Sequence, residues 1–274
     1  MKDQIDLSAM QSVPVIGPYG YPRLHRYWRE PTGEMWDEIW LRTPSRDYWK
    51  AAMQGQLPLD YAPLFNKYLP KGSRLLEAGC GVGQVVLALR AQGFNCYGLD
   101  YAENVIKLLN EEFPEVPFTQ GDIRDIPYPD AFFDGYITLG VIEHFVDGQR
   151  EMLAEAARVI KKGGHIFVSV PVLNGFRKLR CKLSTYDRHA NLPFFESCIS
   201  VEELSSLLRE NGFEPLEVIY TNTVMTFAQE TPIRPLYRHI EDVRYVRGGV
   251  DRLLRLFLPK SYFGHMVMVI GCKQ

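Results

Sequence analysis

The chain has 274 residues, of which 46% are hydrophobic and 23% charged, and its formal net charge is −2 at pH 7. This size and composition predict a soluble globular protein with one large domain, or one domain with a sizeable insertion. The balanced charge excludes a general attraction to nucleic acid, and no apolar run approaches the ~20 residues of a membrane-spanning helix.

Residues 1–70 carry aromatic side chains at helical spacing. Trp36 and Trp40 lie one helical turn apart, and Tyr48 and Trp49 follow them. This spacing predicts a helical N-terminal cap, 1–70, ahead of the main domain, 71–274. Such aromatics more often pack in a core than bind a ligand, although a cap over the edge of a sheet also contacts whatever binds there.

Residues 71–274 alternate between strand and helix patterns. Repeated strand–helix–strand units predict an α/β fold with a doubly wound, parallel sheet. Two segments outside the pattern, 171–200 and 221–264, are predicted as insertions. The predicted strands are 75–78, 95–99, 116–119, 133–139, 165–170, 213–220 and 266–272, and the predicted helices are 83–91, 102–112, 148–160 and 201–210.

A glycine-rich loop follows the first of these strands, in the stretch RLLEAGCGVGQVVL. A dinucleotide-binding loop has its third glycine three positions after the second, but Gln84 stands there and the third glycine, Gly83, comes one residue early. The carboxylate of Glu77, two residues before the first glycine, repels phosphate and suits a cation. No Gly-Lys-Ser/Thr follows, so a P-loop is excluded. The loop predicts a nucleoside ligand with positive charge and no phosphate.

S-adenosylmethionine has this character, because it carries a sulfonium, an ammonium group and a ribose diol. Asp100 ends the second predicted strand, where its carboxylate can accept from both ribose hydroxyls. Asp122 follows the third strand and can accept from the adenine amino group, and Ile123 can cover the ring. Three strand ends are thus predicted to meet at one ligand.

Four segments resemble, in order and spacing, the motifs of class I S-adenosylmethionine-dependent methyltransferases: EAGCGVGQ, GLDYAENVI, GDIRDIPYPDAFFDGYITLGVIEHF and KKGGHIFVSVP. The match covers roughly residues 60–220 and the terminal strand, and it is similar to the branch with ubiquinone- and menaquinone-type methyltransferases. The resemblance implies a Rossmann-like, seven-stranded sheet with an antiparallel last strand, and insertions that shape the acceptor site. It places ten residues at the cofactor: Glu77, Gly79, Gly81, Gln84, Asp100, Tyr101, Asp122, Ile123, Leu139 and Gly140.

His144 follows the fourth predicted strand and is the candidate catalytic residue. Methyl transfer mainly requires the acceptor to be aligned with the leaving sulfur, and a base helps when the acceptor is a hydroxyl or a carbon acid. His144 can be that base, but a histidine near a helix start is as often a packing residue. Glu143 beside it is predicted to be structural or solvent-facing. The Asn-Pro-Pro-aromatic motif of adenine and amide N-methyltransferases is missing from this position.

No metal site is predicted. The five cysteines are odd in number, scattered and without a CxxC pair, which excludes a disulfide framework and a zinc site. Paired acidic residues that would bind magnesium are also missing near the ends of the fourth and fifth strands. The N-terminal residues do not resemble a secretory leader, so we expect a cytoplasmic protein.

The basic residues gather in two segments. Residues 172–190 and 231–264 each have a net charge of +4, which leaves −10 for the remainder. This contrast predicts an anionic acceptor, or one presented at an anionic membrane surface. The run Leu253–Leu258 can contact such a surface peripherally, although a run this short more often packs onto the sheet. The sequence therefore predicts a methyltransferase for a small-molecule, glycan or lipid-precursor acceptor. An RNA-directed methyltransferase and a non-catalytic cofactor-binding module remain as alternatives.

Overall fold

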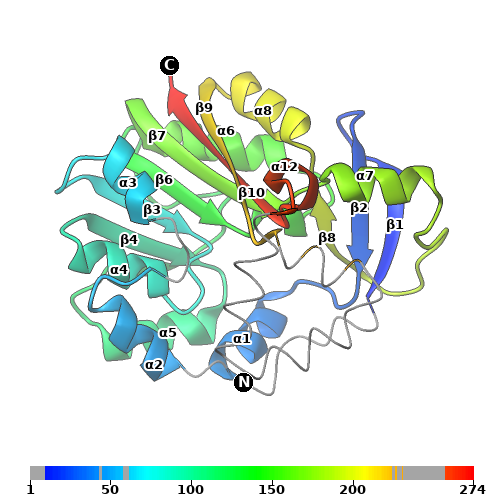
Figure 1. Ribbon diagram of the computed structural model, residues 1–274. Coiled ribbons are helices and arrows are strands. Elements are labelled where there is room, and N and C mark those ends of the chain that lie inside the picture. Colours follow the sequence, from blue (N-terminus) through cyan, green and yellow to red (C-terminus); the bar gives the residue numbers. More distant parts are fainter. Residues whose placement is uncertain (1–9, 43–44, 58–61, 224–225, 227–229, 231–256) are drawn as a thin grey trace.

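The fold is taken from a computed structural model, which describes residues 10–42, 45–57, 62–223, 226, 230 and 257–274 (Figure 1). Most of the basic segment 231–264, including the greater part of the run Leu253–Leu258, lies outside the described residues. No helix in the described ranges is long and apolar enough to cross a bilayer.

A seven-stranded sheet forms the centre of the molecule, with the order β5-β4-β3-β6-β7-β10-β9. The pairs from β5 to β7 are parallel, and β10 runs antiparallel to both β7 and β9. The predicted Rossmann-like sheet with an antiparallel last strand is therefore confirmed. Its strands are β3 (Arg74–Ala78), β4 (Asn95–Asp100), β5 (Phe118–Gln120), β6 (Phe133–Leu139), β7 (Ile160–Pro171), β9 (Phe213–Thr221) and β10 (Met266–Lys273).

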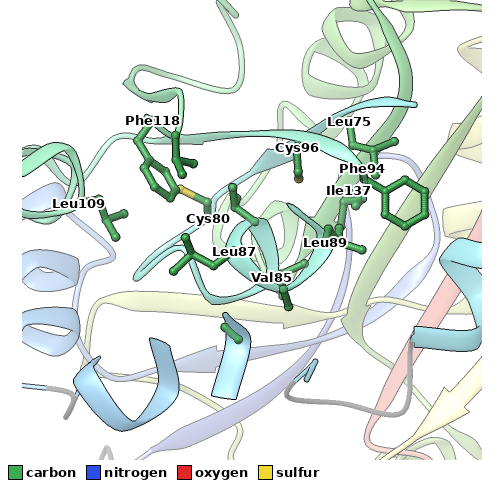
Figure 2. Close-up of a cluster of buried hydrophobic side chains, with 14 of the residues drawn as sticks. Leu75, Cys80, Val85, Leu87, Leu89, Phe94, Cys96, Leu109, Phe118 and Ile137 are labelled. Carbon is green, nitrogen blue, oxygen red and sulfur yellow. The ribbon is translucent and has the colours of Figure 1, made fainter. Parts of the chain in front are cut away.

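Helices bury both faces of this sheet. Neighbouring residues of a strand point to opposite faces, so they pack into different hydrophobic clusters. Leu75 packs into one hydrophobic cluster and Leu76 into another. The first cluster lies under α2 (Ser45–Ala52), α3 (Ala62–Tyr68), α4 (Gln84–Ala91) and α5 (Glu103–Glu112), and Figure 2 shows part of it around α4. The second lies under α6 (Gln149–Val159) and α8 (Val201–Glu210). Because the strands from β5 to β7 are parallel, their carboxyl ends lie at one edge of the sheet.

The N-terminal segment contains strands as well as helices, which corrects the purely helical cap. Strands β1 (Gln11–Ile16) and β2 (Pro22–Tyr27) form a hairpin, and β2 also pairs with β8 (Phe194–Cys198) of the first insertion. This small sheet lies beside the large one, with α7 (Gly175–Lys182) next to it (Figure 1). The division of the chain at residue 70 stays a prediction.

Two buried carboxylates fasten the N-terminal segment to the main domain. Glu203 of α8 accepts two close hydrogen bonds from Arg23 of β2, at 2.7 and 3.0 Å, and both side chains are fully buried. Asp37 of α1 (Gly33–Arg42) accepts from the backbone amide of Val105 at 3.0 Å, in the first turn of α5. The Asp37 contact holds α1 against α5, and Trp36 and Trp40 of α1 line the cavity at the carboxyl edge of the sheet.

Candidate active site

A cavity of about 540 Å³ opens at the carboxyl ends of β3, β4 and β6. This size is typical of a site for a small molecule or cofactor, about 300–1,000 Å³. All eleven residues predicted from the sequence line it: Glu77, Gly79, Gly81, Gln84, Asp100, Tyr101, Asp122, Ile123, Leu139, Gly140 and His144. The structure thus brings the whole predicted set to one place.

The glycine loop between β3 and α4 shapes one wall of the cavity. Gly79 and Gly81 have φ angles of +82° and +47°, in the left-handed region that favours glycine. A Cβ atom on Gly79 would lie 2.3 Å from Val141 Cγ2, and one on Gly81 would lie 3.0 Å from Trp40 Cε2. Side chains at these two positions would therefore narrow the cavity. Gly83 instead allows close packing in the core, because a Cβ atom added there would lie 2.7 Å from the Phe118 ring.

Two buried carboxylates line the same wall. Burial raises the pKa of Glu77 well above its usual range, and Glu77 Oε2 accepts from the Val86 amide at 3.1 Å. Burial also raises the pKa of Asp100, although its two oxygens accept from the amides of Gly81 at 2.8 Å and Ala102 at 3.0 Å. Each oxygen keeps a lone pair for a ligand donor. Burial opposes the ionisation of both acids, and a cationic, hydrogen-bond-donating ligand would offset that effect.

The next part of the rim comes from the ends of β4 and β5. The Tyr101 hydroxyl donates to the Pro31 carbonyl at 2.6 Å, which ties the segment before α1 to the cavity edge. Asp122 accepts a two-point hydrogen bond from Arg124, whose guanidinium lowers the pKa of that carboxyl. Ile123 is buried and presents an apolar surface. Asp122, a hydrogen-bond acceptor for an amino group, and the apolar Ile123 are therefore neighbours in the sequence, and both line the cavity.

His144 ends the short 3-10 helix Ile142–His144 that follows β6. Its Nδ1 lies 2.8 Å from the carbonyl oxygen of Phe195, in β8. A carbonyl can only accept, so Nδ1 carries a hydrogen and Nε2 keeps a free lone pair in the neutral ring. Burial lowers the pKa of His144. The ring is thus a neutral imidazole on the cavity wall with one nitrogen able to accept a proton.

The sequence did not predict the aromatic wall of this cavity as part of the site. Trp36 and Trp40 of α1 line it, stacked with ring centroids 5.9 Å apart, and Phe145 lines it as well. Trp36 packs edge-on against His144, with a centroid distance of 4.9 Å. The helical spacing of the tryptophans predicted only that they share a helix face, and the docking of α1 on α5 turns that face toward the cavity.

Behind His144, three side chains with metal-ligand atoms come together. Donor atoms of Glu143, His144 and Glu196 all lie within 4.8 Å of one another. Glu143 is buried, which corrects the alternative that it faces solvent, and its Oε2 has no hydrogen-bond partner among the described residues. Glu196 Oε1 accepts from Arg26 at 2.7 Å. Sequence reasoning missed the cluster because Glu196 is distant in the chain.

The basic residues of the first insertion are largely neutralised within the fold. Glu230 pairs with the buried Arg177 at 3.0 Å and with Arg180. Lys178 pairs with Glu202 at 3.4 Å. None of these three cations lines the cavity, whereas Arg124 does. The local charge of residues 172–190 therefore does not by itself make this cavity basic.

The cavity fits S-adenosylmethionine on the chemistry of its own residues. Gly79 and Gly81 leave room that a Cβ atom would fill, Glu77 and Asp100 offer buried carboxyl oxygens to a cationic or hydrogen-bond-donating ligand, and Asp122 and Ile123 offer an acceptor beside an apolar face. The methionyl part with its sulfonium fits beside the glycines and Glu77, the ribose diol fits Asp100, and the adenine ring fits Asp122 and Ile123.

Comparisons with known proteins agree with this assignment. Residues 76–168 match the family model of a methyltransferase domain. A probable S-adenosylmethionine-dependent methyltransferase of Mycolicibacterium smegmatis is 34% identical over 143 residues, 52% of this chain and 52% of that protein. A demethylmenaquinone methyltransferase of Anoxybacillus flavithermus is 29% identical over 177 residues, 54% of this chain and 73% of that protein. The chain spans about half the length of the mycobacterial relatives it matches.

A solved structure extends the likeness to nearly the whole chain. The 1,6-didemethyltoxoflavin-N1-methyltransferase of Burkholderia thailandensis, with bound 1,6-didemethyltoxoflavin and S-adenosylhomocysteine, superposes with a TM-score of 0.54. It shares 17% sequence identity and the match covers 96% of this chain and 99% of that one. At this identity the likeness concerns the fold alone.

Proposed function

We propose that this chain moves a methyl group from S-adenosylmethionine to a small-molecule acceptor. Residues 76–168 match the model of a methyltransferase domain, and relatives over about half of the chain are S-adenosylmethionine-dependent methyltransferases. The relationship predicted from the sequence motifs is confirmed by the domain match and by the relatives. The observation that carries the proposal is the cavity, because every residue assigned to cofactor or catalysis from the sequence lines it.

The cofactor would lie along the glycine loop. Its methionyl part would be held by Glu77, Gly79, Gly81 and Gln84, and its ribose by Asp100. The adenine would lie against Tyr101, Asp122 and Ile123, and the methyl group would lie near Leu139 and Gly140. When bound, S-adenosylmethionine supplies a methyl group made electrophilic by the sulfonium. The chain orients that group and excludes water, since Trp36 and Trp40 cover the cavity with apolar surface.

His144 would act as the general base. Its Nδ1–H is held by the Phe195 carbonyl, so Nε2 is the nitrogen that can take the acceptor's proton. Burial keeps the ring neutral before the reaction, because it disfavours the imidazolium. This arrangement supports an acceptor with an acidic hydrogen, such as a hydroxyl or an activated carbon.

The acceptor is proposed to be a small molecule, including a glycan or lipid precursor. One relative is named for demethylmenaquinone, and one protein of similar fold is named for 1,6-didemethyltoxoflavin, which are both small molecules. We propose an anionic acceptor from the net charge of +4 in residues 231–264. Arg124 lines the cavity but is paired with Asp122 at 2.6 Å, so it does not carry this proposal by itself. Contact with an anionic membrane surface is also proposed from the composition of residues 231–264.

The test is an acceptor screen with isotopically labelled S-adenosylmethionine, read by mass spectrometry. The set should pair anionic and neutral forms of each phenol, quinol and lipid precursor. A product that gains one labelled methyl group, and that fails to form with a His144→Asn variant, supports the proposal. Cofactor binding without transfer to any acceptor would instead favour a non-catalytic module.

A further inference from the structure

Strand β8 of the first insertion holds the candidate base from behind. The Phe195 carbonyl accepts from His144 Nδ1 at 2.8 Å, and the Phe195 ring packs edge-on against the imidazole with a centroid distance of 4.8 Å. Trp36 packs against the same ring from α1. The tautomer and the orientation of His144 are therefore set by residues far from it in the chain.

The charged groups that face His144 come from three elements. Glu143 lies on its own 3-10 helix, Glu196 follows Phe195 on β8, and Arg26 of β2 pairs with Glu196 at 2.7 Å. Glu196 and Arg26 are mostly buried, with side chains 13% and 5% exposed. Because solvent screens a mostly buried charge weakly, the carboxylate of Glu196 acts strongly on a ring less than 5 Å away.

We propose that Glu196, held in place by Arg26, is a positioning residue that stabilises the protonated form of His144 during methyl transfer. This inference rests on the proposed function. As the acceptor atom forms its bond to the methyl carbon, the carbon–sulfur bond breaks with its electron pair left on sulfur, and the acceptor's proton passes to Nε2 of His144. The positive charge thus moves from the sulfonium to the imidazolium, beside Glu196. A carboxylate next to a catalytic imidazole stabilises the charge that forms there.

Glu196 rather than Glu143 carries this charge. Glu196 is paired with the Arg26 guanidinium at 2.7 Å, whereas Glu143 is buried with Oε2 unpartnered among the described residues. Burial and the neighbouring Glu196 raise the pKa of Glu143 well above its usual range, which opposes its ionisation. A metal ion is the competing occupant of the three side chains, but Arg26 already supplies positive charge at Glu196.

The first experiment needs no acceptor. The protein has six histidines, and His144 can be assigned in a spectrum of isotopically labelled histidine by comparison with His144→Asn. With saturating S-adenosylhomocysteine, Glu196→Gln should lower the pKa of His144 further, because the group that raises it is lost. Glu196→Asp should restore part of the shift. The matched control is Glu202→Gln, whose carboxylate is 65% exposed and pairs with Lys178.

The second experiment uses turnover once an acceptor is known. Glu196→Gln should reduce kcat ~10-fold, part of the 10²–10⁴ that a general base contributes, with S-adenosylhomocysteine affinity unchanged. An unchanged His144 titration in Glu196→Gln overturns the inference whether or not the protein methylates anything. Stoichiometric Mn²⁺ binding that Glu196→Gln abolishes also overturns it, because the cluster is then a metal site. A shifted titration without any turnover would instead count against the proposed function alone.

Discussion

Two glycines with the same backbone φ angle allow the effect of cavity shape on cofactor binding to be distinguished from the effect of backbone strain. Gly79 and Gly72 both have φ +82°. A Cβ atom on Gly72 meets nothing within 4 Å, whereas one on Gly79 lies 2.3 Å from Val141 Cγ2. Gly79→Ala and Gly72→Ala therefore share the strain of a left-handed residue and differ in one steric contact beside the proposed cofactor.

The expected magnitudes follow from these contacts. An alanine in the left-handed region costs ~1–2 kcal/mol of folding free energy in either variant. In Gly79→Ala the new methyl group overlaps Val141, since apolar carbons normally stay ~3.5–4.0 Å apart, and this overpacking costs a further ~1–3 kcal/mol. Val141 lines the cavity, so its displacement should weaken S-adenosylhomocysteine binding by at least ~10-fold, which corresponds to ~1.4 kcal/mol.

Urea denaturation and isothermal titration with S-adenosylhomocysteine measure the two effects separately. Gly72→Ala should lose stability but bind S-adenosylhomocysteine as the wild type does. Gly79→Ala should lose more stability and also lose affinity. Equal affinities in the two variants would refute the placement of the cofactor against Gly79 and Val141.

Three further substitutions test other parts of the account. The folded protein holds a proton on Glu77 to higher pH than the unfolded chain, so its unfolding free energy should fall as pH rises from the ordinary pKa through the raised one. In Glu77→Gln, urea denaturation across that pH range should show a smaller fall in the free energy of unfolding. Calorimetry should show weaker S-adenosylmethionine binding. Glu203→Gln leaves Arg23 buried without its charge partner and should destabilise the protein by ~3–5 kcal/mol in urea, and a loss below 1 kcal/mol would contradict the buried pair. His144→Asn should lower turnover ~10²-fold or more while calorimetry finds S-adenosylhomocysteine affinity within a factor of two, and full activity would make His144 a packing residue.

The large sheet and the cofactor edge could be predicted because their signals are local. Strands β3 to β6 each end at an acid or directly before a glycine, such as Ala78 before Gly79 and Asp100 at the end of β4. Parallel strands bring their carboxyl ends to one edge, so residues assigned to strand ends had to meet. The eleven predicted residues share one cavity for this reason.

The small sheet could not be predicted because its pairing is long-range. Strand β2 reads PRLHRY, which looks like exposed surface, yet Arg23 and Arg26 are buried against acids about 170 to 180 positions away. Pro14 within β1 also argues against a strand, although β1 lies at the edge of its sheet where proline is tolerated. No local pattern in the sequence identifies the partners of these arginines.

The residues around His144 could not be predicted either, because some of them come from strand β8, which is distant in the chain. The sequence placed this histidine after the fourth strand but left open whether it was a base or a packing residue. The contact with the Phe195 carbonyl, which fixes the tautomer, depends on β8 folding back across the chain. Its role as a base stays a prediction that the geometry supports.

Calorimetric titration of the wild-type protein with S-adenosylmethionine and, separately, with NAD tests the central claim most directly. Glu77 and Asp100 are buried acids beside the glycine loop, so they should favour a cationic nucleoside and repel a pyrophosphate. We expect one molecule of S-adenosylmethionine to bind per chain and NAD to bind far more weakly. Tighter binding of NAD, or no binding of S-adenosylmethionine, would contradict the account.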